Sequence, residues 1–314
     1  MARKNMYVLV TGGAGFIGSN TVDYLLAQGH RVRVLDNLST GKKANLNLKH
    51  PNLEFKCGDV RDMKVLPKAL DGVTHVLHLA AQVSGSLSVE NPRETFDINT
   101  CGFMCLIDAI RIINPKIRLV HASSAGVYGN PEVIPCKEEH ARKCCTLSPY
   151  ALSKLYDEQC GELYHRLYKM PVLALRYFNV FGPRQDPKSV YSGVISKFLC
   201  SGIEDNKIVV YGDGKQTRDF IAVHDVVRAN YLALISRYSG VINIGTGKRI
   251  SILCLIKTIE GILNCKFNVQ FKAHRKGDVR YSVADINKAK EYLHFDPEHT
   301  LKQGLRNFIA SLIC

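Results

Sequence analysis

The sequence predicts an α/β protein, a doubly wound parallel sheet of the Rossmann type with a smaller interleaved α/β substrate-binding domain. Two observations predict this class. Short apolar runs of strand length alternate with segments of helical length through the first half of the chain. A glycine-rich turn joins the first apolar run to the first helical segment. Of the 314 residues, 46% are hydrophobic, which is enough to build a large core.

The first turn predicts a site for a dinucleotide phosphate. Residues 6–10 form the first strand, and Gly12, Gly15 and Gly18 follow it before a helix that runs to about Gln28. Glycines at this spacing allow a tight turn and a close approach of the backbone to a pyrophosphate. The unpaired N–H groups and the positive dipole end of the helix then face the phosphates.

The second strand, residues 31–35, leads into Asp36, which lies eighteen positions after Gly18. A carboxylate at this distance accepts hydrogen bonds from the ribose hydroxyls and repels a 2′-phosphate. We therefore expect NAD rather than NADP. An acidic loop residue without a ligand is the alternative interpretation.

The rest of the first half continues the alternation. Three more strands and one long helix are expected at residues 52–57, 74–79, 117–121 and 92–113. Asp59 is placed for an adenine edge, although a plain turn aspartate would look the same. The small side chains of Ala80 and Ala81 leave room for a cofactor at a strand end. On the long helix we expect three apolar or thiol side chains to pack inside or against a partner, namely Cys101, Cys105 and Ile112.

The stretch from Ser148 to Lys154 carries the predicted chemistry. A helix that begins at Pro149 places Tyr150 and Lys154 on the same face, one turn apart. An ammonium held near a phenol favours the phenolate and makes its oxygen a usable general base. Alone, such a pair is more often a surface tyrosine and a solvated lysine. The strand topology changes this interpretation, because it brings Ser124 to the same sheet edge as Tyr150.

The second half builds the smaller domain and adds two strands to the sheet. Strands are expected at 171–175, 208–211, 241–244 and 268–271, and helices at 190–199, 223–236, from 251, from 285 and from 300. We therefore divide the chain into two interleaved parts. Residues 1–176 with 223–247 form the expected NAD-binding domain, and residues 177–222 with 248–314 the substrate-binding domain.

Net charge and cysteine content narrow the possible functional classes and the expected cellular compartment. The net charge of +14, from 42 Lys and Arg against 28 Asp and Glu, suits an enzyme for polyanionic small molecules. The basic residues are scattered, so we expect no nucleic acid partner. Apolar runs are too short to span a bilayer, and the N-terminus lacks a secretion signal. Eleven cysteines without a C-x-x-C pair favour free thiols, no metal site and a cytoplasmic protein.

The ordered motifs resemble the extended short-chain dehydrogenase/reductase family, and within it the nucleotide-sugar 4-epimerases, closest to those of UDP-N-acetylglucosamine. The resemblance covers nearly the whole chain. The matching stretches are residues 11–18, 36–41, 78–81, 123–129, 148–154, 176–183, 212–220 and 243–247.

This resemblance implies a role for each matching residue. The catalytic residues would be Ser124, Tyr150 and Lys154, with Tyr150 as the base. The NAD contacts would be Gly12, Gly15, Phe16, Ile17, Asp36, Asn37, Asp59, Val60, Leu79, Ala80, Ala81, Asn99, Ser123, Tyr150, Lys154 and Tyr177. The UDP-sugar contacts would be Ser84, Ser124, Tyr150, Asn179, Val194, Tyr211, Arg218, Arg275, Asp278 and Ser282.

Departures from related enzymes sharpen the expected reaction. The stretch Ser124-Ala125-Gly126 lacks the acid that the related dehydratases and decarboxylases carry, which disfavours dehydration. Ser282 stands where epimerases strict for UDP-galactose have a bulky tyrosine, so an acetamido group has room at C2 of the sugar. The resemblance thus implies an NAD-dependent 4-epimerase of UDP-N-acetylglucosamine and its galacto epimer, with UDP-glucose as a weaker substrate.

Other functions remain open at this point. A UDP-uronate 4-epimerase, or another nucleotide-sugar oxidoreductase or decarboxylase of the family, would share the scaffold. A non-catalytic NAD-sensing protein would need the glycine loop and Asp36 but no base. Relatives also lead us to expect a homodimer formed by the helices around 92–113 and 149–169.

Overall fold

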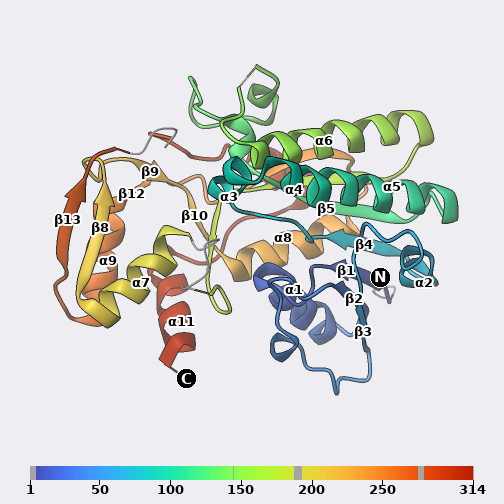
Figure 1. Ribbon diagram of the computed structural model, residues 1–314, viewed down its shortest axis with the longest axis horizontal. Helices are drawn as coiled ribbons and strands as arrows, with labels where there is room; N and C mark the ends of the chain where they lie inside the picture. The colour runs from blue at the N-terminus through green and yellow to red at the C-terminus, as the bar shows by residue number, and fades with distance from the viewer. Residues whose placement is uncertain (1–4, 144, 187–192, 275–278, 314) are drawn as a thin grey trace.

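The computed structural model describes residues 5–143, 145–186, 193–274 and 279–313 (Figure 1). Its centre is a seven-stranded sheet in the order β11-β6-β5-β4-β1-β2-β3, and all neighbouring strands are parallel. The strands are β1 Tyr7–Thr11, β2 Arg31–Asp36, β3 Leu53–Cys57, β4 His75–His78, β5 Arg118–Ser124, β6 Val172–Tyr177 and β11 Gly240–Ile244. The predicted fold class is confirmed, including the last strand at the sheet edge.

Helices cover both faces of the sheet, which explains why its strands are almost continuously apolar. Within β1, Val8 and Val10 face one hydrophobic core and Leu9 faces the other. The first core is closed by α1 Phe16–Ala27, α8 Val223–Ile235 and α10 Asn287–Leu293. The second is closed by α2 Leu66–Leu70, α5 Gly102–Ile113 and α6 Pro149–Tyr168. In Figure 1, α5 and α6 lie above the sheet and α1 and α8 below it.

The long helix expected over 92–113 is interrupted. The structure has α4 Pro92–Phe96, a π-helical turn Asp97–Cys101, and then α5. The extra residue in a π turn shifts the side chains that follow and often marks a functional position. Cys101 is exposed and Ile112 is 64% exposed, so neither packs inside this chain. For these two side chains, only packing against a partner remains as a prediction.

A second lobe stands beside the end of the sheet and has a core of its own (Figure 1). Its main elements are α7 Val194–Asp205, β8 Lys207–Tyr211, α9 Ile252–Leu263, β13 Asn268–Lys272 and α11 Leu301–Ile313. Strands β8 and β13 pair in parallel at its outer side. The expected helix 190–199 is found as α7 from Val194 and extends further than predicted, while residues 190–192 lie outside the described residues.

Two short ladders belong to this second lobe, and the sequence did not predict them. Strand β7 Asn179–Phe181 pairs with β10 Phe220–Ala222, and β9 Thr217–Arg218 pairs with β12 Ile250–Ser251. The remaining short elements are η1 Lys43–Asn45, α3 Gly85–Glu90, η3 Ala125–Tyr128 and η4 Glu138–Lys143.

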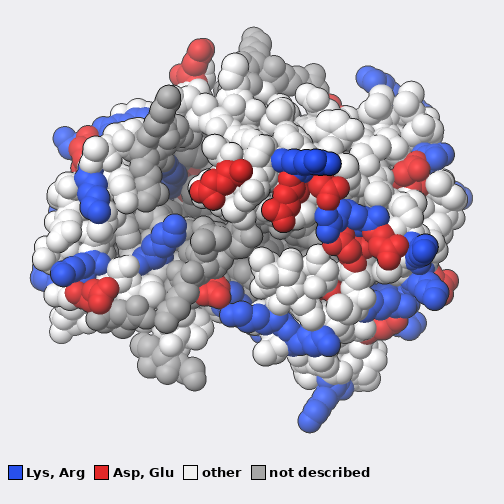
Figure 2. Space-filling model, in the orientation of Figure 1, with Lys and Arg blue, Asp and Glu red and all other residues white. Residues whose placement is uncertain are grey.

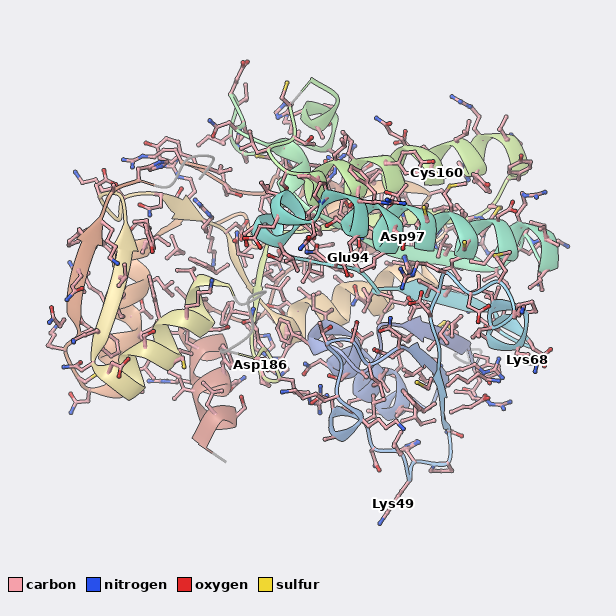
Figure 3. All side chains as sticks on the ribbon, in the orientation of Figure 1. Lys49, Lys68, Glu94, Asp97, Cys160 and Asp186 are labelled. Atoms are coloured by element: carbon pink, nitrogen blue, oxygen red, sulfur yellow. The ribbon has the colours of Figure 1, made fainter. Side chains whose placement is uncertain are left out.

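An ion pair links the two lobes. Asp186 lies between them (Figure 3) and pairs with Lys42 at 3.1 Å, from the loop after β2. Over the face drawn in Figure 2, Lys and Arg are interspersed with Asp and Glu and do not gather into one patch. None of the described helices has both the length and the apolar character that a membrane span requires.

Candidate active site

The glycine turn after β1 is held directly against the end of β4. Gly12 has a φ of +68°, and a Cβ atom there would lie 2.7 Å from the backbone nitrogen of Ala80. A Cβ on Gly18 would collide with the carbonyl oxygen of Gly12. Both positions therefore require glycine. The first turn of α1, which begins at Phe16 and Ile17, directs its free N–H groups over this turn, a geometry suited to a pyrophosphate.

Asp36 is fixed at the carboxyl end of β2. One carboxylate oxygen accepts the N–H of Ala14 at 2.9 Å, and the other accepts the N–H of Leu38 at 2.8 Å. Leu38 adopts a φ of 61°, which turns the chain back over the glycine turn. The carboxylate is buried but keeps lone pairs for further donors, as a ribose site requires.

The expected adenine edge lies beside it. Asn37 donates a hydrogen bond from its side-chain nitrogen to Asp59 at 2.9 Å, and Arg61 donates to both oxygens of the same carboxylate. Arg61 therefore holds the pKa of Asp59 well below its usual value, although burial acts in the opposite direction. Val60 directs its side chain into the core against Gly102. An aspartate fixed in this way stays ionised, and its charge is balanced by the guanidinium of Arg61.

The end of β4 is tied to the π-helical turn. Leu79, Ala80 and Ala81 are partly buried where the strand ends. Asn99, which is 1% exposed, accepts the N–H of Gln82 at 2.8 Å and donates to Ser153 at 2.9 Å. The polar atoms of Asn99 are thus engaged within the protein, which favours a positioning role for its side chain.

The predicted base and its cation share α6. Pro149 opens this helix, Ser148 caps it by accepting the N–H of Ala151 at 3.2 Å, and Tyr150 and Lys154 follow on successive turns. Tyr150 is partly buried, whereas Lys154 is 2% exposed. The alternative of a solvated lysine is therefore excluded, because this ammonium is buried next to the sheet.

Ser124 ends β5 and lies beside the first turn of α6. Its hydroxyl accepts the N–H of Gly126 at 3.0 Å, and a Cβ on Gly126 would lie 3.5 Å from the Cβ of Ala151. Ala151 is the neighbour of Tyr150. The structure thus brings the strand end and the helix start together, as the parallel topology predicted.

A buried charged network supports this side of the site. Glu158 receives two hydrogen bonds of 2.7 Å from the guanidinium of Arg176 and a third from Ser123. The side chains of Glu158 and Arg176 are 3% and 4% exposed. Arg176 also donates to the hydroxyl of Tyr128 at 2.9 Å, and that hydroxyl donates to Asn243. The network connects α6 with β5, β6 and β11 behind the predicted catalytic residues.

Next to Ser124 is a cavity of about 230 Å³. Five of the predicted site residues line it: Ser124, Tyr177, Asn179, Arg218 and Ser282. They come from β5, β6, β7, β9 and the segment after residue 279, so the cavity is shared between the sheet and the second lobe. The predicted polar residues of the sugar site, which are far apart in the sequence, converge here.

Tyr177 forms part of the cavity wall, and its hydroxyl group points away from the cavity into the protein interior. Its hydroxyl donates to Asn230 at 2.6 Å, and burial raises the pKa of this phenol well above its usual value. This phenol therefore stays neutral. It can offer a rigid aromatic surface to a ligand, but not a base.

The sugar side of the cavity depends on Asp219, which the sequence reasoning missed. This fully buried carboxylate accepts the backbone N–H groups of Thr246, Gly247 and Ala284 at 2.8, 2.9 and 3.1 Å. Its neighbour Arg218 lines the cavity from β9. A buried acid within the Arg218-Asp219-Phe220 motif, followed later by a Gly-Thr-Gly turn, is the signal that could have found it.

Other predicted contacts lie apart from the cavity. Ser84 caps α3 by accepting the N–H of Leu87, Val194 packs against the core of the second lobe, and Tyr211 ends β8. Arg275 and Asp278 fall outside the described residues. These contacts remain predictions.

The described residues fit a bound dinucleotide. The glycine turn leaves no space for side chains between β1 and β4, and Asp36 offers an anchored acceptor at the neighbouring strand end. The order of the sheet reverses between β1 and β4, which is where open parallel sheets bind such cofactors.

Comparisons with known proteins agree with this geometry. The family model described as GDP-mannose 4,6 dehydratase matches residues 9–308. A putative UDP-glucose 4-epimerase of Methanocaldococcus jannaschii is 41% identical over 304 residues, which is 96% of this chain and 97% of that protein.

Two solved structures are similar over almost their whole length. The UDP-N-acetylglucosamine 4-epimerase from Methanobrevibacter ruminantium M1, in complex with UDP-N-acetylmuramic acid, has a TM-score of 0.94 and 38% identity, and covers 99% of each chain. The UDP-glucose 4-epimerase of Thermus thermophilus, in complex with NAD, has a TM-score of 0.89 and 36% identity, and covers 98% of this chain and 99% of the other.

The predictions of an isomerase and of NAD as its cofactor are confirmed at the level of the family. The chain belongs to the extended short-chain dehydrogenase/reductase family, and it is similar there to the UDP-sugar 4-epimerases.

Proposed function

We propose that this chain is an NAD-dependent 4-epimerase that interconverts UDP-N-acetylglucosamine and UDP-N-acetylgalactosamine, with UDP-glucose as a weaker substrate. One observation carries the proposal. A single cavity at the carboxyl end of β5 gathers a hydroxyl at a strand end, Ser124, an arginine for phosphates, Arg218, and a small residue, Ser282. The similar structure named as a UDP-N-acetylglucosamine 4-epimerase supports the choice of sugar.

NAD would be held by the glycine turn and Asp36, and when bound it would supply reversible hydride transfer at C4 on either face of the sugar. Tyr150 removes the proton of the 4-hydroxyl group as the hydride leaves, and Lys154 stabilises the phenolate. Ser124 shares the same proton by hydrogen bonding. Tyr150 then returns the proton when the 4-keto sugar is reduced, so neither protons nor electrons are consumed overall.

The nucleotide end of the substrate would be held while the sugar turns over. Arg218 can offer a bidentate donor to the diphosphate, and Asn179 contributes an amide from β7. Binding energy from the remote nucleotide then retains the flat intermediate, while the sugar itself is held loosely enough to rotate. Residues 1–176 with 223–247 would bind NAD, and residues 177–222 with 248–314 the nucleotide sugar.

The sugar preference depends on the volume beside Ser282. This residue is partly buried, its N–H donates to the carbonyl of Thr217 at 3.2 Å, and it lines the cavity. A serine leaves space that a tyrosine ring would fill. An acetamido group on C2 can occupy that space.

We further propose a cytoplasmic homodimer. All cysteines in the described part of the chain are free thiols, as a reducing compartment predicts. Helix α6 carries an exposed apolar stripe at helical spacing, formed by Leu152, Tyr156, Leu163 and Leu167. A second copy that covers this stripe, together with Ile112 on α5, would remove it from water.

The test is a substrate panel. The purified protein is incubated separately with UDP-N-acetylglucosamine, UDP-glucose and UDP-glucuronic acid, and the C4 epimers are resolved by chromatography. We expect the highest kcat/KM with UDP-N-acetylglucosamine, lower activity with UDP-glucose, and no net formation of NADH. Preference for the uronate would support the uronate 4-epimerase instead, and net NADH would indicate a dehydrogenase. Binding of NAD without any turnover would indicate a sensor.

A further inference from the structure

One buried acid near the site is not used by the mechanism above. Asp157 follows Lys154 by three residues on α6, and their side chains are 0% and 3% exposed. One carboxylate oxygen lies 3.4 Å from the Lys154 ammonium, long for a charge-assisted hydrogen bond. The other oxygen has no partner among the described residues. Asp157 is therefore a buried acid that is only partly stabilised.

The groups around this pair come from four elements. On α6 the titratable neighbours are Glu158, Cys160 and Tyr156, and from β4 and β5 His78 and His121 face Lys154. Helix α5 contributes the apolar side chains Phe103 and Met104.

None of these neighbours changes its protonation state near neutral pH. Burial and the nearby ammonium lower the pKa of His78 to about 3 and that of His121 well below its usual value, so both are neutral. Burial raises the pKa of the Cys160 thiol to about 11. Glu158 is already paired with Arg176. What varies around Lys154 is thus the charge of Asp157.

Burial raises the pKa of Asp157 to about 7, while attraction to Lys154 acts against it. The carboxyl group therefore changes its charge within the physiological range. When it is protonated, the Lys154 ammonium acts on Tyr150 without an opposing charge. When it is ionised, it offsets that ammonium and attracts it towards the third turn of the helix, away from Tyr150 on the first.

We propose that Asp157 is a positioning residue that shares the Lys154 ammonium with Tyr150 and thereby sets the pH range in which Tyr150 acts as a base. The inference rests on the proposed role of Tyr150. It predicts that an uncharged residue at 157 strengthens the effect of Lys154 on the phenolate wherever the wild-type carboxylate is ionised.

The test compares Asp157→Asn with the wild type by the pH dependence of kcat/KM for epimerisation. The amide keeps the shape of the side chain but not its charge. We expect the acidic limb of the profile to move to lower pH by about one unit, so that kcat/KM on that limb rises about tenfold relative to its plateau. Asp108→Asn, which removes a partly exposed carboxylate from α5, is the matched control and leaves the limb in place.

A second readout needs no substrate. In the NAD-bound protein, the ultraviolet absorbance of tyrosinate is titrated against pH, and the same titration of Tyr150→Phe identifies the contribution of Tyr150. In Asp157→Asn, the midpoint of the Tyr150 titration should move to lower pH by the same amount as the acidic limb of kcat/KM. An unchanged midpoint in a folded, NAD-bound Asp157→Asn protein overturns the inference. If no UDP-sugar is turned over, the proposed function fails while this titration still decides the role of Asp157.

The wild type provides a check that does not depend on the folding of the variant. With ¹³C-labelled aspartate, carbon NMR of the NAD-bound protein should contain one carboxyl signal that titrates near neutral pH, because Asp157 is neutral below that range and ionised above it. Absence of any such signal overturns the inference.

Discussion

The two sides of the proposed active site are built differently. On the catalytic side, Tyr150 and Lys154 belong to a long helix whose third turn is fixed by the buried Glu158–Arg176 pair. On the sugar side, Asn179 and Arg218 belong to strands of three and two residues. The first side is positioned by a buried ion pair between two side chains. The second is positioned by short backbone ladders and by backbone N–H groups that donate to Asp219.

This difference means that the catalytic residues and the residues that select the sugar are supported by different parts of the protein. The catalytic side depends on Glu158 and Arg176, and a change of either one leaves its charged partner unpaired in the interior. The sugar side is held by backbone hydrogen bonds, three of which are donated to the carboxylate of Asp219, so its cavity-lining side chains can vary without repacking. The following predictions test this contrast from the largest expected effect to the smallest.

Removing the base should have the largest effect. Tyr150→Phe lacks the hydroxyl that takes the proton, so we expect kcat to fall by about 10³-fold or more. The ring remains, and NAD binding and the melting temperature should be close to those of the wild type. Chromatographic epimerase assays and NAD content after purification check this. Near-normal turnover would refute the role of Tyr150.

Breaking the buried pair should damage the fold of the catalytic side. Glu158→Gln leaves the Arg176 guanidinium buried without its anion, and we expect the free energy of unfolding to fall by about 3 kcal/mol. Urea denaturation measures the change. Glu162→Gln, an exposed position on the same helix, is the control and should change stability by less than about 0.5 kcal/mol. If Glu158→Gln and Glu162→Gln lowered the free energy of unfolding equally, the buried ion pair would not be what holds the catalytic side.

A change on the sugar side should alter preference and leave the fold intact. Ser282→Tyr fills the volume assigned to the acetamido group, so the ratio of kcat/KM for UDP-N-acetylglucosamine over UDP-glucose should fall about tenfold or more. Ser282→Ala keeps the space and should keep the ratio. If the tyrosine variant retains the wild-type ratio, the acetamido group lies elsewhere.

The smallest effect concerns acid stability. His121 is buried and neutral in the folded chain, and its Nδ1 atom has no partner among the described residues. Its folded pKa is depressed, so the unfolded chain binds its proton first, and stability is lost as pH falls below about 6.5. The loss is up to about 1.4 kcal/mol per pH unit.

His121→Met removes this titration. We expect the melting temperature of the variant to fall less than that of the wild type between about pH 7 and pH 5, as measured by circular dichroism. Parallel pH dependence in the two proteins would contradict the prediction.

The sheet could be predicted from the sequence because both of its faces are covered. Each central strand is then a continuous apolar run, and the strands of the seven-stranded sheet were placed within about three residues of their observed limits. The two-residue ladder of Thr217–Arg218 could not be predicted, because two residues carry no periodic signal. The π-helical turn at Asn99 was missed because its apolar spacing resembles that of a regular helix.

Sequence motifs alone give the expected site residues, but they do not reveal the buried groups that support these residues. Asp36, Tyr150 and Lys154 stand in recognisable local patterns. Asp157 and Glu158 resemble part of a solvated helical face, since nothing local reveals that this turn of α6 faces the sheet. Arg176, the partner of Glu158, lies eighteen residues further along the chain, and only the fold joins the two.

Helix α6 carries three functional side chains at intervals of four residues, namely Tyr150, Lys154 and Glu158. Inserting or deleting one residue between these positions would rotate the following part of the helix by about 100°. Either the Glu158 carboxylate or the Lys154 ammonium would then no longer face the sheet. We therefore expect homologous chains to gain and lose residues in the loops before Ser148 and after Tyr168, while the spacing inside this helix stays invariant.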